Sequence, residues 1–276
     1  MDEHGSAHVP GRHERIEQIR RRVIDSGFVS IEALAEAFGV SAMTIHRDLG
    51  ELERQGWLQK VRGGATARAT SRVHGDVRQR MVTMTAEKEA LARAAVKLVQ
   101  PGSSVILDES TTALPVAQWL PAREPVTVIT HFLSAIRLLA GQPGIELIAL
   151  GGEYMPAYDA FFGKATTDAI APLRADLLVM STTAITDAAC HHETMETVRV
   201  KHALMQAASS KVLLVDHTKF ERRALHRLAP LTAFDLVLVD DALDADTLAD
   251  LRERGVPVRV VSVVAEAEVL PLTTAG

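Results

Sequence analysis

The sequence predicts an α/β protein with two domains: an N-terminal winged helix-turn-helix domain, then a larger domain built on a doubly wound, mostly parallel Rossmann-like sheet. A length of 276 residues, 47% of them hydrophobic, is enough for two hydrophobic cores. Helical hydrophobic spacing dominates the first 54 residues, whereas short aliphatic runs alternate with helical stretches after residue 81. The second pattern is typical of parallel strands that helices cover on both faces.

The composition excludes several classes of protein. No uninterrupted apolar run approaches the roughly 18 residues that a membrane-spanning helix needs, and residues 1–11 lack a basic-then-apolar secretory pattern. We therefore expect a cytoplasmic protein without a membrane partner. Cys190 is the only cysteine, which rules out an intramolecular disulfide.

Two amphipathic helices begin the N-terminal domain, which we place at residues 12–65. Apolar residues recur at helical spacing over residues 12–25, and Gly27 ends this segment. Ser30 is placed to cap a second helix that continues to Phe38. Gly39 then turns the chain toward a third helix.

The third helix, which Ser41 can cap, is predicted to be the recognition helix of a helix-turn-helix motif. Ile45, Leu49 and Leu52 fall at i, i+4 and i+7 and form its inner face. On or beside the outer face we expect Met43, Thr44, His46, Arg47 and Asp48. The guanidinium of Arg47 is the best candidate for a base contact, because it can bond guanine bidentately.

A basic hairpin follows the third helix and reads as the wing. Trp57 and Leu58 are apolar, and Lys60 to Gly64 form a basic tip that contains two glycines. Residues 66–80 read as a basic linker, because Arg54 to Arg80 include seven Lys or Arg residues against Asp76 alone. A polyanion partner or a solvated linker would both explain this charge. Together with the motif, it predicts that DNA is bound by Ser41, Met43, Thr44, His46, Arg47, Lys60 and Arg62.

The larger domain is placed at residues 81–262, with a tail at 263–276. Strands are predicted at 104–107, 126–129, 145–150, 176–180, 212–215, 236–239 and 256–261. Helices are predicted at 87–98, 112–119, 133–140 and 198–208. In open α/β sheets, ligands bind at the carboxyl ends of the strands.

Polar residues gather where these strands end. Hydroxyls and backbone N–H groups after the first strand would converge at a helix N-terminus, an arrangement suited to phosphate. Lys201 lies near the start of a later helix. Singly, each feature is more typical of a cap, a turn or a surface pair, but their recurrence predicts a site for a compact anion such as a sugar phosphate. The candidate residues are Asp108, Ser110, Thr111, Thr112, Thr130, Gly151, Gly152, Lys201, Asp216 and Lys219.

Both halves resemble the DeoR family of bacterial transcriptional regulators. The N-terminal half does so through residues 40–49 and the sequence Val-Arg-Gly-Gly-Ala at 61–65. The larger half does so through the loop 108–112, Val200-Lys201, and the pair Asp216 and Lys219. The resemblance implies a sensor domain that shares its fold with ribose-5-phosphate isomerases and CoA transferases. It also implies that a phosphorylated sugar is bound by Asp108, Thr111, Thr112, Lys201, Asp216 and Lys219.

A histidine-rich stretch, Cys190-His191-His192-Glu193, contains side chains that can bind zinc. Adjacent residues rarely bind one ion together, so we predict no metal site and no cofactor. We expect this stretch to lie on the rim of the pocket, with His191 or His192 available to touch the ligand.

The function predicted from these patterns is a transcriptional regulator, in this family usually a repressor of carbohydrate metabolism genes, and not an enzyme. Its expected partners are a double-stranded DNA operator, a small phosphorylated metabolite and further copies of itself, because helix-turn-helix proteins usually dock as dimers. One alternative is an isomerase or transferase with a DNA-binding appendage, in which Asp108 or Glu109 acts as general base. Another is an adaptor whose winged helix binds protein.

Overall fold

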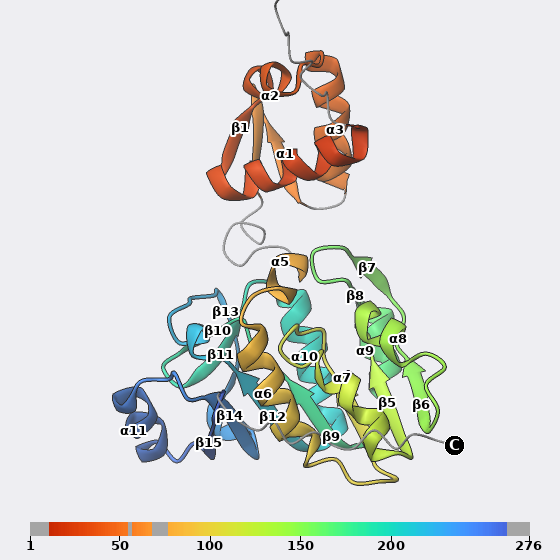
Figure 1. Cartoon of the computed structure of the whole chain (residues 1–276), viewed down its shortest axis with the longest axis vertical. Helices are drawn as coiled ribbons and strands as arrows, with labels where there is room; N and C mark the ends of the chain where they lie inside the picture. The colour runs from red at the N-terminus through yellow and green to blue at the C-terminus, as the bar shows by residue number, and fades with distance from the viewer. Residues whose placement is uncertain (1–10, 55–56, 68–76, 264–276) are drawn as a thin grey trace, which may run out of the picture.

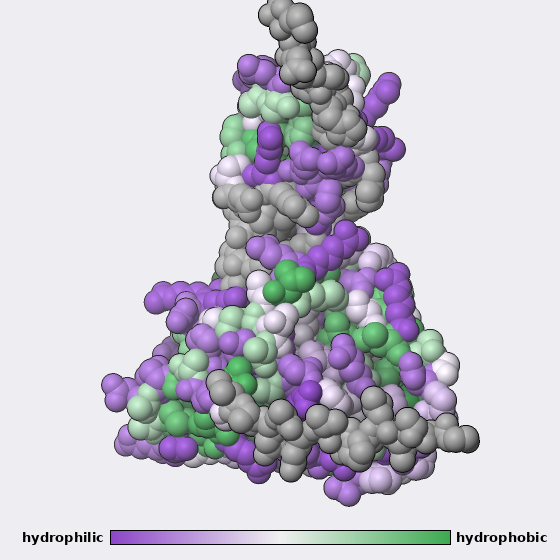
Figure 2. Space-filling view, viewed as in Figure 1, coloured by the Kyte–Doolittle hydropathy of each residue, from purple (hydrophilic) through white to green (hydrophobic). Residues whose placement is uncertain are grey.

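The structure, a computed structural model, describes residues 11–54, 57–67 and 77–263. Figure 1 shows a small N-terminal lobe and a larger sheet lobe. Hydrophilic side chains are spread over the visible face of both lobes, between smaller hydrophobic patches (Figure 2). None of the helices in the described ranges is long and apolar enough to cross a membrane.

The N-terminal lobe packs three helices against a small antiparallel sheet. Its elements are α1 (Arg12–Ser26), β1 (Phe28–Ser30), α2 (Ile31–Phe38), α3 (Ala42–Arg54), β2 (Leu58–Val61) and β3 (Gly64–Ala67), with the strand order β1-β3-β2. Both predicted caps are confirmed: Ser30 Oγ accepts from Ala33 N at 3.1 Å, and Ser41 Oγ accepts from Thr44 N at 3.2 Å. The core includes the fully buried Ile19, Ile45 and Leu49.

The wing requires a glycine where it crosses β1. A Cβ atom at Gly64 would lie 2.2 Å from the carbonyl oxygen of Val29 and 2.8 Å from the ring of Phe28. Gly64 pairs with Ser30 of β1 and with Val61 of β2, so the wing hairpin is part of the lobe's sheet. The absence of a side chain therefore lets three strands meet at this point.

The sheet lobe is built on seven parallel strands in the order β15-β14-β12-β9-β4-β5-β6. The strands are β4 (Ser104–Leu107), β5 (Val126–Thr130), β6 (Ile145–Ala149), β9 (Ala175–Met180), β12 (Ala208–Val215), β14 (Leu236–Asp240) and β15 (Val258–Val261). After β4 the chain adds β5 and β6 on one side of that strand, and β9 then pairs with β4 on its other side. This reversal creates a topological switch point between β4 and β9, where α/β sheets bind ligands.

Helices cover both faces of the sheet, as the alternating pattern predicts, and each face has its own core. One core includes α6 (Thr85–Val96) and α7 (Val116–Trp119), and the other includes α9 (Lys164–Ile170), α10 (Met195–Ala207) and α11 (Ala245–Glu253). The remaining helices are α5 (Val77–Met81), α8 (Leu133–Leu139) and the 3-10 turns η1 (Leu120–Arg123), η2 (His217–Lys219) and η3 (Leu231–Ala233).

Two small antiparallel sheets were not predicted: β7 (Glu153–Met155) pairs with β8 (Ala160–Phe162), and β11 (Ala189–His192) lies between β10 (Ala184–Thr186) and β13 (His226–Pro230). These strands have three to five residues each, too few for a clear hydrophobic alternation.

Two predicted helices differ from the structure. Residues 111–115 form turns, and α7 begins only at Val116, because Pro115 has no N–H to donate to the carbonyl of Thr111. The prediction that the 108–112 loop leads directly into a helix N-terminus is therefore wrong. The predicted helix 198–208 instead begins at Met195, where Thr194 caps it by accepting from Thr197 N at 3.2 Å. Lys201 thus lies in the middle of α10, not near its start.

The predicted linker 66–80 is only partly described. Residues 66 and 67 belong to β3, and residues 77–80 belong to α5, whose Val77 is buried in the core of the sheet lobe. Arg68 and Arg72 lie outside the described residues, as does the predicted tail beyond Val263.

Candidate effector pocket and DNA-binding surface

The exposed side of α3 carries the side chains predicted to meet DNA. Met43 is 64% exposed, His46 and Arg47 are exposed, Thr44 is half-buried, and Ser41 is exposed at the cap. Lys60 and Arg62 are exposed on the wing. The backbone N–H of Lys60 donates to Glu53 Oε1 of α3 at 2.8 Å, so the wing is tied to the recognition helix.

Asp48 does not lie on the outer face of α3, where the helical spacing placed it. It is 1% exposed, and its carboxylate lies 2.8 Å from Arg15 Nε and 3.6 Å from Arg12 Nε, both on α1. Asp48 therefore fixes α3 against α1, and the orientation of the recognition helix depends on this ion pair.

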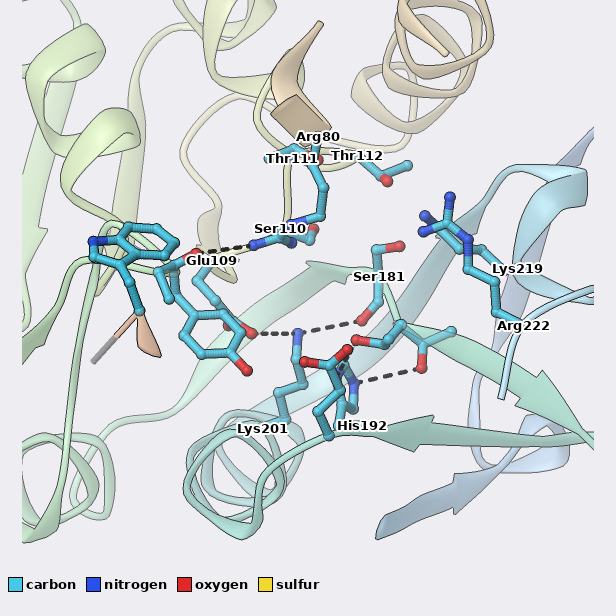
Figure 3. Close-up of a pocket in the computed structure, with 16 residues that line it drawn as sticks. Arg80, Glu109, Ser110, Thr111, Thr112, Ser181, His192, Lys201, Lys219 and Arg222 are labelled. Atoms are coloured by element: carbon cyan, nitrogen blue, oxygen red, sulfur yellow. Dashed lines mark hydrogen bonds and ion pairs between the residues drawn. The ribbon is translucent and has the colours of Figure 1, made fainter. Parts of the chain in front are cut away.

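A pocket lies at the switch point of the sheet, beyond the ends of β4 and β9 (Figure 3). Of the predicted residues, Ser110, Thr111, Thr112, Lys201 and Lys219 line it. Asp108 and Asp216 are buried and contact its lysines. The cavity has a volume of about 40 Å³, room for about three water molecules.

Lys201 forms the buried ionic centre of the pocket. Its Nζ lies 2.5 Å from Asp108 Oδ2 and 3.0 Å from Glu109 Oε1, and it donates to the carbonyl of Ser181 at 3.2 Å. Burial lowers the pKa of Lys201, but the two carboxylates outweigh it and hold that pKa above its usual value. Burial raises the pKa of Glu109, but Lys201 and the nearby His131 outweigh it and hold that pKa well below the usual range. Lys201 and Glu109 are therefore both charged near pH 7.

A second group of cations lies on the other side of the 110–112 loop from Lys201. Lys219 lies 3.3 Å from Asp216, and Lys88 donates to Thr111 Oγ1 at 3.2 Å and to the carbonyl of Arg80. Burial and the nearby Lys219 lower the pKa of Lys88 to about 8, and burial also lowers the pKa of Lys219. Both lowered pKa values reflect ammonium groups that are buried near other cations.

Three predicted residues have structural contacts and do not line the pocket. Thr130 is fully buried, and its Oγ1 accepts from Phe132 N at 3.1 Å. Gly151 accepts a hydrogen bond from Thr166 Oγ1 at 2.8 Å through its carbonyl, and a Cβ at Gly152 would lie 2.1 Å from that same hydroxyl. Thr130 is the last residue of β5 and the two glycines follow β6, and both strands lie to one side of the switch point.

Several lining residues were not among the predicted binding residues. Arg80, Tyr158 and Arg222 line the pocket, and Figure 3 shows Arg222 beside Lys219. His192 also lines it, as one of the two histidines expected at the rim, whereas His191 is not among the lining residues and has its Nδ1 3.0 Å from the carbonyl of Ala189. Arg80 occupies a basic run and His192 follows a strand, but no local signal marks Tyr158.

The histidine-rich stretch also bears on metal binding. Within the described ranges no three His, Cys, Asp or Glu side chains are grouped so that they could hold a metal ion. Cys190 is fully buried, and burial raises the pKa of its thiol to about 12. Burial also lowers the pKa of His192 well below its usual value, so its ring is neutral near pH 7.

Comparison with known proteins finds matches over both lobes. The DeoR-like helix-turn-helix domain matches residues 15–71, and the DeoR C-terminal sensor domain matches residues 83–241. The glycerol-3-phosphate regulon repressor of Escherichia coli (strain K12) is 32% identical over 230 residues, which cover 83% of this chain and 90% of that protein. The HTH-type transcriptional repressor CsqR of the same strain is 28% identical over 245 residues, covering 88% and 94%.

Among solved structures, ribose 5-phosphate isomerase A from Methanocaldococcus jannaschii is similar to part of the chain. The TM-score is 0.35 and the sequence identity 22%, over 49% of this chain and 53% of that one.

Proposed function

This chain belongs to the DeoR family, and from that premise we propose that it is a sequence-specific DNA-binding transcriptional repressor, active in the cytoplasm on carbohydrate metabolism genes. A small phosphorylated sugar bound in the pocket of the sheet lobe controls its binding to DNA. Two relatives that span most of the chain are named as repressors, which supports the proposal.

The observation that carries the effector is the cationic end of the pocket. Lys219, Arg80 and Arg222 line it beside the hydroxyls of the 110–112 loop, and Lys88 donates to one of those hydroxyls, Thr111 Oγ1, at 3.2 Å. Two carboxylates are near, Asp216 beside Lys219 and Glu193 in the lining. A phosphate group would pair with these cations, while Glu109, Ser181 and the threonines offer acceptors and donors to sugar hydroxyls. The name of one relative, a glycerol-3-phosphate regulon repressor, is consistent with this class of ligand.

On the DNA side, α3 enters the major groove with Arg47 toward a base edge, and the wing places Lys60 and Arg62 at phosphates. The repressor acts as a homo-oligomer, because two copies are needed to read two half-sites.

The proposal is tested by selecting bound sequences from random duplex DNA at fixed salt, with and without a panel of sugar phosphates. We expect an enriched repeat whose recovery one ligand changes. Arg47→Ala should weaken binding to the best site by about 1–3 kcal/mol and relax one base position. Lys60→Ala and Arg62→Ala should instead each reduce the slope of log affinity against log salt by about 1. Absence of any enrichment at low salt would contradict the repressor function.

We also propose that the chain is not an enzyme. The arrangement of Glu109 beside Lys201 would suit a base next to an oxyanion stabiliser, as in an isomerase. However, a general base needs a pKa near the working pH, whereas the pKa of Glu109 is held far below it by Lys201. Incubation with the bound sugar phosphate should return it unchanged, and its conversion would contradict this part of the proposal.

A further inference from the structure

The pocket is not formed by the sheet lobe alone, because Trp57 of the N-terminal lobe also lines it. On the facing side, the loop between β7 and β8 contributes Ala157 and Tyr158 to the lining. Ala157 packs against the core of the N-terminal lobe, and its carbonyl accepts a hydrogen bond from Arg80 at 3.4 Å. The candidate effector site and the contact between the two lobes therefore share residues.

Trp57 is fixed within the N-terminal lobe. It is 6% exposed, and the guanidinium of Arg20 of α1 lies 4.5 Å from the centre of its ring. Its backbone N–H donates to the carbonyl of Leu52 of α3 at 2.9 Å, and β2 of the wing begins at the next residue, Leu58. A displacement of Trp57 thus moves the recognition helix and the wing together.

The enclosed part of the pocket is small. Its volume is about 40 Å³, so a sugar phosphate seated fully inside it would have to displace part of the lining. The floor of the pocket is rigid, because Lys201, Asp108 and Glu109 are buried and ion-paired. Beside Trp57, by contrast, a cleft of about 600 Å³ lies between the lobes, lined by α1 and α3 on one side and by α5 and the β7–β8 loop on the other. The wall that can yield is the one supplied by the other lobe.

We propose that Trp57 closes the effector pocket and that a bound sugar phosphate displaces it, which undocks the DNA-binding lobe from the sheet lobe. Ligand and docked Trp57 compete for the same space, so ligand binding is coupled to the position of α3 and the wing. This mechanism rests on the proposed effector function and specifies how that site acts on the DNA-binding lobe.

The test uses Trp57 as its own reporter. The chain has two tryptophans, so Trp119→Phe leaves Trp57 as the single fluorophore. The full-length variant is titrated with glycerol 3-phosphate, fructose 6-phosphate and glucose 6-phosphate, and binding is measured independently by calorimetry. We expect the emission of Trp57 to shift to longer wavelength, as the ring becomes exposed to water, over the concentration range in which calorimetry detects binding.

A second variant perturbs the contact between the lobes while Trp57 itself is kept. Ala157→Gln places a larger neutral side chain in this contact, and Ala122→Gln, at an exposed position in η1, is the matched control. Ala157→Gln should shift the emission of Trp57 in the absence of ligand, because the larger side chain separates the two lobes. Ala122→Gln should leave that emission unchanged.

The outcomes separate the two proposals. Calorimetric binding without a change in Trp57 emission, or an unchanged emission in ligand-free Ala157→Gln, would overturn the displacement mechanism and leave the effector site standing. If none of the three sugar phosphates binds either the parent or Ala157→Gln, the effector function fails and the displacement mechanism fails with it.

Discussion

Replacing Lys201 with methionine should destabilise the sheet lobe strongly, because it removes the cation that two buried carboxylates contact. The side chains of Lys201, Asp108 and Glu109 are 1%, 0% and 4% exposed. Breaking a buried ion pair costs about 3–5 kcal/mol of unfolding free energy, since a buried charge loses its partner. Asp108 keeps hydrogen bonds from the backbone N–H groups of Ser110 at 3.0 Å and Ser181 at 2.9 Å, so most of the loss should arise at Glu109.

Denaturation in urea, followed by the emission of Trp119 in a Trp57→Phe background, measures this loss in the sheet lobe. Adding Glu109→Gln to Lys201→Met should restore part of the lost stability, because it removes the unpaired charge. The matched control is Lys164→Met. Lys164 is 86% exposed and lies 2.6 Å from Asp168 on the surface of α9, so its loss should change stability by less than about 0.5 kcal/mol.

The effect of Lys201→Met should also depend on pH. In the parent protein the pKa of Glu109 is lowered from 4.5, so its ion pair stabilises the fold above that pH and is lost as the pH falls through the folded-state value. Without Lys201, burial raises the pKa of Glu109 instead, so the variant is penalised at neutral pH and recovers relative to the parent as the pH falls. A loss under about 1 kcal/mol at pH 7, or no rescue by Glu109→Gln, would refute the buried ion-pair reasoning.

Three further predictions concern other parts of the molecule. Asp48→Asn should lower the unfolding temperature of the N-terminal lobe and weaken DNA binding, because it breaks the ion pair between α3 and α1. A DNA affinity equal to that of the parent, at a temperature where the variant is folded, would contradict this. Gly64→Ala should destabilise the same lobe in calorimetry through its clash with β1, whereas Gly11→Ala, with open space around it, should not. Burial raises the pKa of Glu193 in the pocket to about 7, so its carboxylate becomes charged and the affinity for a sugar phosphate should fall as the pH rises through 7. Glu193→Gln should flatten this dependence of affinity on pH between pH 6.5 and 8. An unchanged dependence would rule Glu193 out as its cause.

The sequence alone determined the kind and order of most elements, because these depend on local chemistry. Helix caps at Ser30 and Ser41, the helical spacing of Ile45 and Leu49, and seven aliphatic runs predicted the N-terminal helices and the strands of the parallel sheet. The motif residues also identified the family, since they lie at fixed intervals along the chain.

Only the tertiary structure decided which of the predicted residues meet. The order of parallel strands is set by crossover connections. The sequence therefore did not show that Thr130 and Gly152 lie at the ends of strands to one side of the pocket. Likewise, the sequence pattern around a charged helical residue does not show whether the side chain faces water or a distant partner. Lys201 contacts Asp108, which lies 93 residues earlier in the chain. Hydrophobic periodicity predicts which face of an element is buried, but not which other element covers that face. The packing of the two lobes decides this, and it places Trp57 in the lining of the pocket.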